Sequence, residues 1–278
     1  MVRVAQHRIA LSAFGVAIGI DTSDDALLSS VRPILPPAST PVSWDEALAK
    51  FSVTRTGAGT FCISQDERSL LAAVELATAI DALDVHIRMF IATHAPEHVF
   101  VHAGAVTHRG RGLLLPGASF AGKTELVASL VRIGATYYSD EYAVLDRDGL
   151  VHPYPRPLSI RTRGKRDSLD VDVRELGGEP GMGPAPIGIL AATHFDPTST
   201  WRPESRSPAA GAMILLAHSA LARRDPMRAL RSVHRAVQHA QVLEGPRGEA
   251  EPTAKALLTA LEASTGPVSE VPKPSPDP

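Results

Sequence analysis

Asparagine is absent from the whole chain of 278 residues. Its absence excludes an N-glycosylation sequon and the metal-binding asparagine of a protein-kinase catalytic loop. It also argues against a Ras-type GTPase, because the guanine-binding Asn-Lys-x-Asp motif needs that residue. Cysteine occurs only at Cys62. One cysteine cannot form an intrachain disulfide, so a disulfide-stapled secreted protein is excluded.

Long hydrophobic runs are also missing. No apolar run reaches the roughly 18 residues that a membrane-spanning helix requires. The segment Met1–Ile20 is interrupted by His7, Arg8 and Ser12, and no cleavage site follows it. We interpret this segment as a strand and not as a signal peptide. We therefore expect a cytoplasmic protein that makes no membrane contact.

The chain has no strong excess of either charge. It contains 28 basic and 30 acidic residues, which gives a net charge of -2. A dedicated nucleic-acid-binding protein is normally basic, so nucleic acid is not an expected partner. Hydrophobic residues make up 44% of the chain and charged residues 21%, which is close to the globular average. The chain can therefore bury a core, and its length corresponds to roughly one or two domains.

Hydrophobic patterning divides the chain into three zones. Residues 1–95 form an α+β region, which ends in a helical pattern over Arg68–Ala95. Residues 96–265 form the main domain, and the proline-rich residues 266–278 form a disordered tail. In the main domain we expect an antiparallel hairpin over 99–116, and a helix and a strand at Lys123–Ile133 and Ala135–Ser139. We then expect a second hairpin over 142–154 and a mobile Gly/Pro-rich loop at Gly177–Gly188. Helices are expected at Ala209–Arg223, Pro226–Ala240 and Thr253–Ser264.

The strongest functional signal is the octapeptide Gly-Ala-Ser-Phe-Ala-Gly-Lys-Thr, between an apolar strand pattern and an amphipathic helical one. It matches the GxxxxGK[ST] pattern of a phosphate-binding loop. Glycines allow the tight turn that aims N–H groups at phosphate oxygens, and the helix dipole favours the same anion. The lysine supplies charge to the β and γ phosphates, and the threonine hydroxyl can bind Mg²⁺. The structural alternative is a glycine-rich turn that caps a helix. The predicted nucleotide-binding residues are Gly117, Ala118, Ser119, Phe120, Ala121, Gly122, Lys123 and Thr124.

Two carboxylates, Asp140 and Glu141, follow the strand expected over Ala135–Ser139. A strand-helix-strand crossover makes the two strands parallel, so the end of the second strand should lie beside the loop. Carboxylates at that place can hold Mg²⁺ or accept a proton from an attacking hydroxyl. The alternative is an acidic turn between strands.

Other polar residues allow a structural and a functional reading. His102 can be an ordinary strand histidine, and Glu125 can be an acid of the first helical turn that the dipole favours. The basic cluster Arg161, Arg163, Lys165 and Arg166 can be a solvated surface or a clamp for an acidic substrate. Tyr137, Tyr138 and Tyr142 are expected in the core. None of the histidine pairs has zinc-site spacing, so no structural metal is expected.

The segment Val101–Leu145 resembles the C-terminal catalytic domain of HPr kinase/phosphorylase, and more closely its HPr-kinase-like relatives. Four landmarks match in order: the strand histidine His102, the loop Gly117–Thr124, the acidic Glu125, and Ser139-Asp140-Glu141 where the family has Ala-Asp-Asp. The hairpin before the loop is similar to that of this family and of phosphoenolpyruvate carboxykinase. The run at 153–161 also looks like the HPr-kinase-like branch, whereas the family's asparagine-containing signature is missing.

The resemblance implies an α/β fold, a P-loop domain with a mixed sheet like that of HPr kinase and phosphoenolpyruvate carboxykinase, behind a small N-terminal α+β region. It implies an ATP- and Mg²⁺-dependent kinase that phosphorylates a hydroxyl, such as a serine, of a peptide, small protein or small molecule. The catalytic residues would be Asp140, as the general base, with His102 and Lys123. Lys123 and the loop backbone would hold ATP, and Thr124 with Glu125 or Glu141 would hold Mg²⁺. A homo-oligomer is compatible with these features. The alternatives are a P-loop NTPase switch and a non-catalytic nucleotide-binding partner protein.

Overall fold

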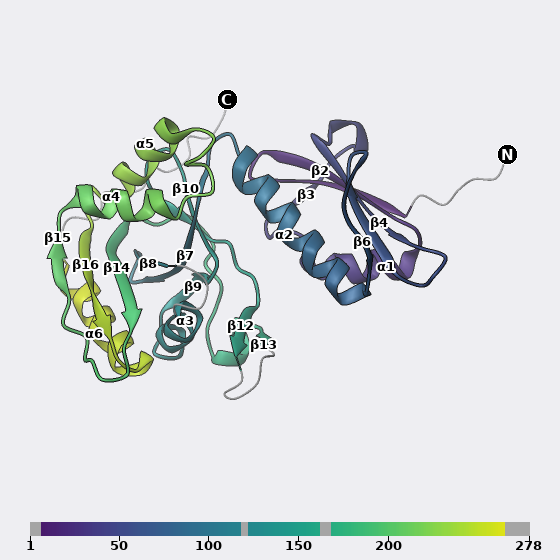
Figure 1. Cartoon of the computed structure of the whole chain (residues 1–278). Helices are drawn as coiled ribbons and strands as arrows, with labels where there is room; N and C mark the ends of the chain where they lie inside the picture. The colour runs from purple at the N-terminus through teal and green to yellow at the C-terminus, as the bar shows by residue number, and fades with distance from the viewer. Residues whose placement is uncertain (1–6, 118–121, 162–167, 265–278) are drawn as a thin grey trace, which may run out of the picture. The chain divides into compact units, whose positions relative to one another are not determined.

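The computed structural model describes residues 7–117, 122–161 and 168–264 (Figure 1). The chain divides into two compact units. Unit 1 contains the chain up to Val101 together with Ser219–Leu230, and unit 2 contains His102–His218 and the chain from Arg231 onward. The sequence suggests a boundary at residues 95–96. It does not predict that a later segment, Ser219–Leu230, belongs to unit 1. The expected tail, 266–278, lies outside the described residues.

Unit 1 is built on a sheet with the strand order β3-β1-β2-β4-β5-β6. Apolar residues at alternate positions of the inner strands, such as Ile18, Ile20 and Phe51, are buried. Helix α2, whose Leu83 and Ile87 are also buried, packs against β4, β5 and β6. The elements are β1 (Arg8–Ala13), β2 (Val16–Thr22), α1 (Asp25–Val31), β3 (Thr40–Pro41), β4 (Ala49–Arg55), β5 (Phe61–Gln65), β6 (Arg68–Val74) and α2 (Leu76–His94), with short 3-10 helices at Arg32–Ile34 and Trp44–Glu46.

Two expectations for this unit are wrong. The segment up to Ile20, interpreted as a strand, forms two strands in its described part, because the chain turns at Phe14–Gly15 and β1 pairs antiparallel with β2. The helix expected over Arg68–Ala95 begins only at Leu76, because the preceding residues form the edge strand β6. Backbone hydrogen bonds to β5 decide the conformation of β6, and local helical spacing does not.

Unit 2 contains a mixed sheet with the order β11-β10-β7-β8-β14-β16-β15, and β9 also pairs with β7. The hairpin expected over 99–116 is confirmed, since β7 and β8 are antiparallel, whereas β14 is parallel to both β8 and β16. The elements are β7 (Val99–His108), β8 (Arg111–Pro116), α3 (Lys123–Arg132), β9 (Thr136–Ser139), β10 (Tyr142–Leu145), β11 (Val151–His152), β12 (Leu158–Arg161), β13 (Ser168–Val171), a 3-10 helix at Val173–Leu176, β14 (Ile187–Phe195), β15 (Glu204–Arg206), α4 (Pro208–Ala217), α5 (Pro226–Val237), β16 (Gln241–Arg247) and α6 (Ala250–Ala263).

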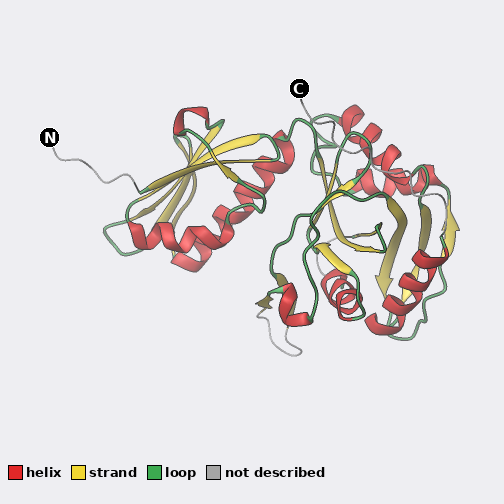
Figure 2. Ribbon diagram, turned by 180° about the vertical axis from the view of Figure 1, so that it is seen from behind, coloured by secondary structure: helices red, strands yellow, loops and turns green. Residues whose placement is uncertain are grey.

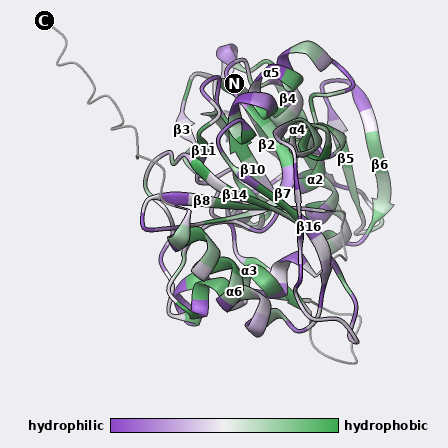
Figure 3. Ribbon diagram, turned by 90° about the vertical axis from the view of Figure 1, so that its left-hand side faces the viewer, coloured by the Kyte–Doolittle hydropathy of each residue, from purple (hydrophilic) through white to green (hydrophobic). Residues whose placement is uncertain are grey.

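Helices cover both faces of this sheet (Figures 2 and 3). Helices α3 and α6 pack together on one face, where Leu126, Leu130 and Leu257 are buried against Leu115 and Ile189 of the strands. Helix α4 lies on the other side, against β16. The expected α/β class with a mixed sheet is therefore confirmed. None of the helices in the described ranges is long and apolar enough to cross a bilayer.

Candidate functional site

The candidate site lies at the N-terminus of α3, at the carboxyl end of β8. Strand β8 ends at Pro116, and α3 begins at Lys123 after Gly122. Gly122 is the N-cap and has a left-handed backbone, with φ 75°, which a residue without Cβ adopts at no steric cost. Four residues of the predicted loop, Ala118, Ser119, Phe120 and Ala121, lie outside the described residues. The structure thus defines the two ends of the predicted loop, Gly117 and Gly122–Thr124.

Lys123 is a cation held out of solvent. Its side chain is only 9% exposed, and Nζ donates a hydrogen bond to the carbonyl oxygen of Gly117 at 2.8 Å. Burial lowers the pKa of Lys123 to about 8, and the negative charge of Asp140 opposes that shift. An ammonium in such a place gains more from an anion than an exposed lysine does, because water screens it less.

Asp140 lies within hydrogen-bond distance of the first turn of α3. Thr124 Oγ1 donates to Asp140 Oδ2 at 3.1 Å. The hydroxyl of Tyr137 lies 3.2 Å from Asp140 Oδ1 and 2.8 Å from the carbonyl oxygen of Arg156, and can donate to either. Burial raises the pKa of Asp140, while the hydrogen bonds from Thr124 and Tyr137 and the charge of Lys123 act in the opposite direction. A carboxylate with a raised pKa is suited to accept a proton.

The turn between β9 and β10 fixes the position of Asp140. The buried Ser139 hydroxyl accepts hydrogen bonds from the backbone N–H groups of Glu141 and Tyr142, at 3.1 and 3.0 Å. The carbonyl oxygen of Glu141 accepts from the N–H of Ala103 in β7 at 3.1 Å. Asp140 therefore stands at the carboxyl end of β9, beside the loop, as the crossover predicts. One detail differs: β9 and β8 do run parallel, but β7 lies between them and is antiparallel to both.

The remaining predicted residues have different surroundings. His102 is half-buried, its ring meets Tyr142 edge to face at 6.2 Å, and its carbonyl oxygen accepts from the N–H of Gly117 at 3.5 Å. Glu125 is exposed and acts electrostatically on Arg247. No group of three or more His, Cys, Asp or Glu side chains within the described ranges is arranged to hold a metal ion. A Mg²⁺ ion here would therefore need oxygen ligands from a bound phosphate as well as from Thr124 and a carboxylate.

Three residues of the site were not predicted from the sequence. Tyr137, expected only in the core, is indeed fully buried but also donates toward Asp140. His218, after α4, lies near Lys123, and burial together with that positive charge lowers its pKa. Arg247, at the end of β16, donates to the carbonyl oxygen of Gly122 at 2.9 Å. Of the predicted basic cluster, residues 162–167 lie outside the described part of the chain, and only the backbone of Arg161 is placed.

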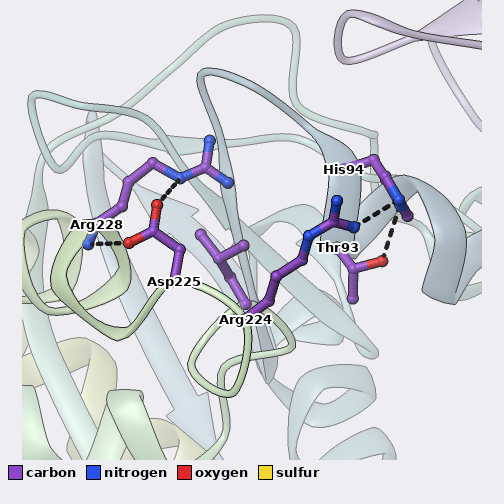
Figure 4. Close-up of a pocket in the computed structure, with 6 residues that line it drawn as sticks. Thr93, His94, Arg224, Asp225 and Arg228 are labelled. Carbon is purple, nitrogen blue, oxygen red and sulfur yellow. Dashed lines mark hydrogen bonds and ion pairs between the residues drawn. The ribbon is translucent and has the colours of Figure 1, made fainter.

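A separate cavity of about 300 Å³ lies in unit 1, between the end of α2 and the segment that precedes and begins α5 (Figure 4). Arg224 Nη1 lies 2.5 Å from His94 Nε2, and Arg228 Nη1 donates to the carbonyl oxygens of Ala95 and Pro96. Asp225 accepts from the backbone N–H of Arg228 at 3.0 Å. These side chains are engaged in holding the segment Leu221–Arg228 to α2, so we place the candidate site at α3.

Comparison with known proteins adds little to this geometry. The chain matches no family model and no curated protein sequence. Among solved structures, it is similar to the Hpr(Ser) kinase/phosphatase from Coxiella burnetii, with 13% sequence identity and a TM-score of 0.35. That match covers 59% of this chain and 96% of the other. The likeness is distant.

Proposed function

We propose that the chain is an ATP-dependent kinase that transfers the γ-phosphate to a hydroxyl group. The observation that carries this proposal is the meeting of three side chains at the N-terminus of α3: the buried ammonium of Lys123, the hydroxyl of Thr124 and the carboxylate of Asp140, with Thr124 and Asp140 in direct contact. A cation, a hydroxyl and a carboxylate at a helix N-terminus have the chemistry that phosphoryl transfer requires.

These residues fit a nucleoside triphosphate with Mg²⁺. Lys123 would bind the β and γ phosphates. Burial disfavours the positive charge of its ammonium group, and a phosphate anion would compensate that charge. The hydroxyl of Thr124 donates a hydrogen bond to Asp140, which leaves the lone pairs of the Thr124 oxygen available to a cation. Bound ATP would supply the phosphoryl group, and Mg²⁺ would neutralise part of the negative charge of the phosphates.

Asp140 is the proposed proton acceptor. The bond between the acceptor oxygen and the γ-phosphorus forms, the bond from that phosphorus to the bridging oxygen of ADP breaks, and the hydroxyl proton passes to a carboxylate oxygen of Asp140. Its raised pKa makes it a better base than an exposed aspartate. The acceptor is a hydroxyl of a peptide, small protein or small molecule, and a net charge of -2 disfavours nucleic acid.

Nucleotide binding is tested by the melting temperature with and without ATP and Mg²⁺, because a ligand bound only by the native state raises it. Lys123→Ala should lose most of that shift, whereas Lys255→Ala, which removes an exposed lysine on α6, should keep it. Transfer is tested by ADP release and by mass spectrometry of candidate acceptors. Equal shifts in the wild type and Lys123→Ala would contradict the site, and rapid hydrolysis without phosphorylated product would indicate an NTPase instead.

A further inference from the structure

Arg247 is the residue from which we draw a further inference. It is the last residue of β16, which runs parallel to β14, and β14 runs parallel to β8. The carboxyl ends of parallel strands meet at one edge of a sheet, which is where ligands of open α/β sheets bind. The Arg247 side chain therefore starts from the same sheet edge as the loop that follows β8. It is 1% exposed, the largest of the fully buried side chains in the described ranges.

The guanidinium of Arg247 is tied to the start of α3. Nη2 donates to the carbonyl oxygen of Gly122 at 2.9 Å, and Nη1 donates to that of Gly248 at 2.9 Å. The same Gly122 oxygen accepts the N–H of Leu126 at 3.3 Å, which is the first hydrogen bond of the helix. The guanidinium also lies over the ring of Phe195, at the end of β14, with 5.3 Å to the ring centroid. One arginine thus joins the ends of β14 and β16 to the N-cap of α3.

Gly122 and Arg247 depend on each other. A Cβ at residue 122 would collide with Nη2 of Arg247, and the left-handed backbone of Gly122 would disfavour a side chain in any case. The space that glycine leaves open is the space that the guanidinium occupies. Two features therefore favour glycine at residue 122: the left-handed backbone and the contact with the guanidinium of Arg247.

The guanidinium of Arg247 has no directly paired carboxylate in the described part of the chain. Among the described residues, Nε has no hydrogen-bond partner, and no carboxylate lies within ion-pair distance of the guanidinium. Burial lowers the pKa of Arg247, and Glu125 and Glu249 offset this only as nearby charges. A buried charge without a paired countercharge is costly, and an apolar side chain of similar size would be more stable in its place. A cost of this kind is expected where the residue serves a binding site.

We propose that Arg247 is a positioning residue of the phosphate site. It holds the peptide group of Gly122, and thereby keeps the backbone of the first α3 turn and the base of Lys123 in one orientation. It acts through the backbone, because two of its three nitrogens are bound to carbonyl oxygens and its side chain is closed to solvent. This inference rests on the proposed function, since it assigns Arg247 to the nucleotide site at α3.

The test compares Arg247→Met and Arg247→Lys with the wild type in two measurements. The first is amide hydrogen exchange in the protein without nucleotide, which should become faster at Leu126 in Arg247→Met and remain unchanged in the middle of α3. The second is the dissociation constant for ATP with Mg²⁺, measured by calorimetry. Loss of a hydrogen bond from a charged donor corresponds to a rise of about tenfold or more in that constant. Arg247→Lys keeps the charge and one donor, so its affinity should be intermediate.

The control is Arg206→Met, which removes an arginine of the neighbouring strand β15 that pairs with Glu244 of β16. It should leave both measurements unchanged. The proposal is overturned if folded Arg247→Met exchanges and binds like the wild type. It is also overturned if neither variant folds, because Arg247 would then serve the fold and not the site. If the wild type binds no nucleotide but exchange at Leu126 still responds, the proposed function fails while the anchoring of α3 stands.

Discussion

Replacing Lys123 by methionine should stabilise the protein in the absence of nucleotide. The ordinary pKa of this lysine is 10.5, and burial lowers it to about 8 in the fold. At 1.36 kcal/mol for each unit, keeping Lys123 charged in the fold costs about 3 kcal/mol. The methionine variant avoids that cost but loses the hydrogen bonds of Nζ, of which the one to Gly117 is worth about 1 kcal/mol. A net gain of up to about 2 kcal/mol in the free energy of unfolding is therefore expected at pH 7.

The pH dependence of the stability difference between the two proteins is a second, independent check of this prediction. Between pH 8 and 10.5 the unfolded chain keeps the Lys123 proton that the folded chain has released, so the stability of the wild type rises with pH in this window. The advantage of Lys123→Met should accordingly be full below pH 8 and shrink towards pH 10.5. Urea unfolding of both proteins at several pH values measures it, and Lys255→Met on α6 is the control, with a change below about 0.5 kcal/mol. A variant less stable than the wild type by the same amount at every pH would refute the reasoning.

Three further predictions concern transfer. Asp140→Asn should lower the rate of phosphorylation about 10²–10⁴-fold while the melting shift with ATP persists, and near wild-type turnover would make Asp140 structural. Tyr137→Phe removes a hydrogen bond that lowers the pKa of Asp140, so the acidic limb of the rate profile should move to higher pH; an unchanged profile would show that Tyr137 does not tune Asp140. ADP release should be slow with ATP alone and accelerate when a hydroxyl acceptor is added, because transfer needs an in-line acceptor and exclusion of water, and equal rates would contradict a kinase.

Part of the site could be predicted from local sequence. The spacing of a loop, a helix and a strand is enough to bring Asp140 to Thr124, because chain connectivity and handedness leave few alternatives. Helix α3 could also be predicted, because its apolar face and the glycine before it are local signals. The 3.1 Å contact between these two side chains is the structural counterpart of that prediction.

The residues that were not predicted depend on long-range pairing. Strand β16 contains Gly245 and Pro246, which read locally as a turn, yet parallel pairing with β14 holds them extended. Arg247 follows these two residues, so its arrival at Gly122 could not be deduced without that pairing. Strand β6 also could not be predicted locally, because its apolar spacing resembles that of the following helix α2. Only the hydrogen bonds to β5 distinguish it as a strand.

Strand β7 acts as a spacer between the two halves of the site. Neighbouring strands lie about 4.8 Å apart, so inserting β7 between β8 and β9 separates the origins of the loop and of Asp140 by about 10 Å. Two directly adjacent strands would leave half that distance. The pairing of β7 with β9 contains an irregularity between Ala105 and Val106. A change in the register of β7 would therefore alter the distance between the origins of Asp140 and of the predicted loop without replacing a residue of either. The backbone of one strand thus sets the spacing of the candidate site.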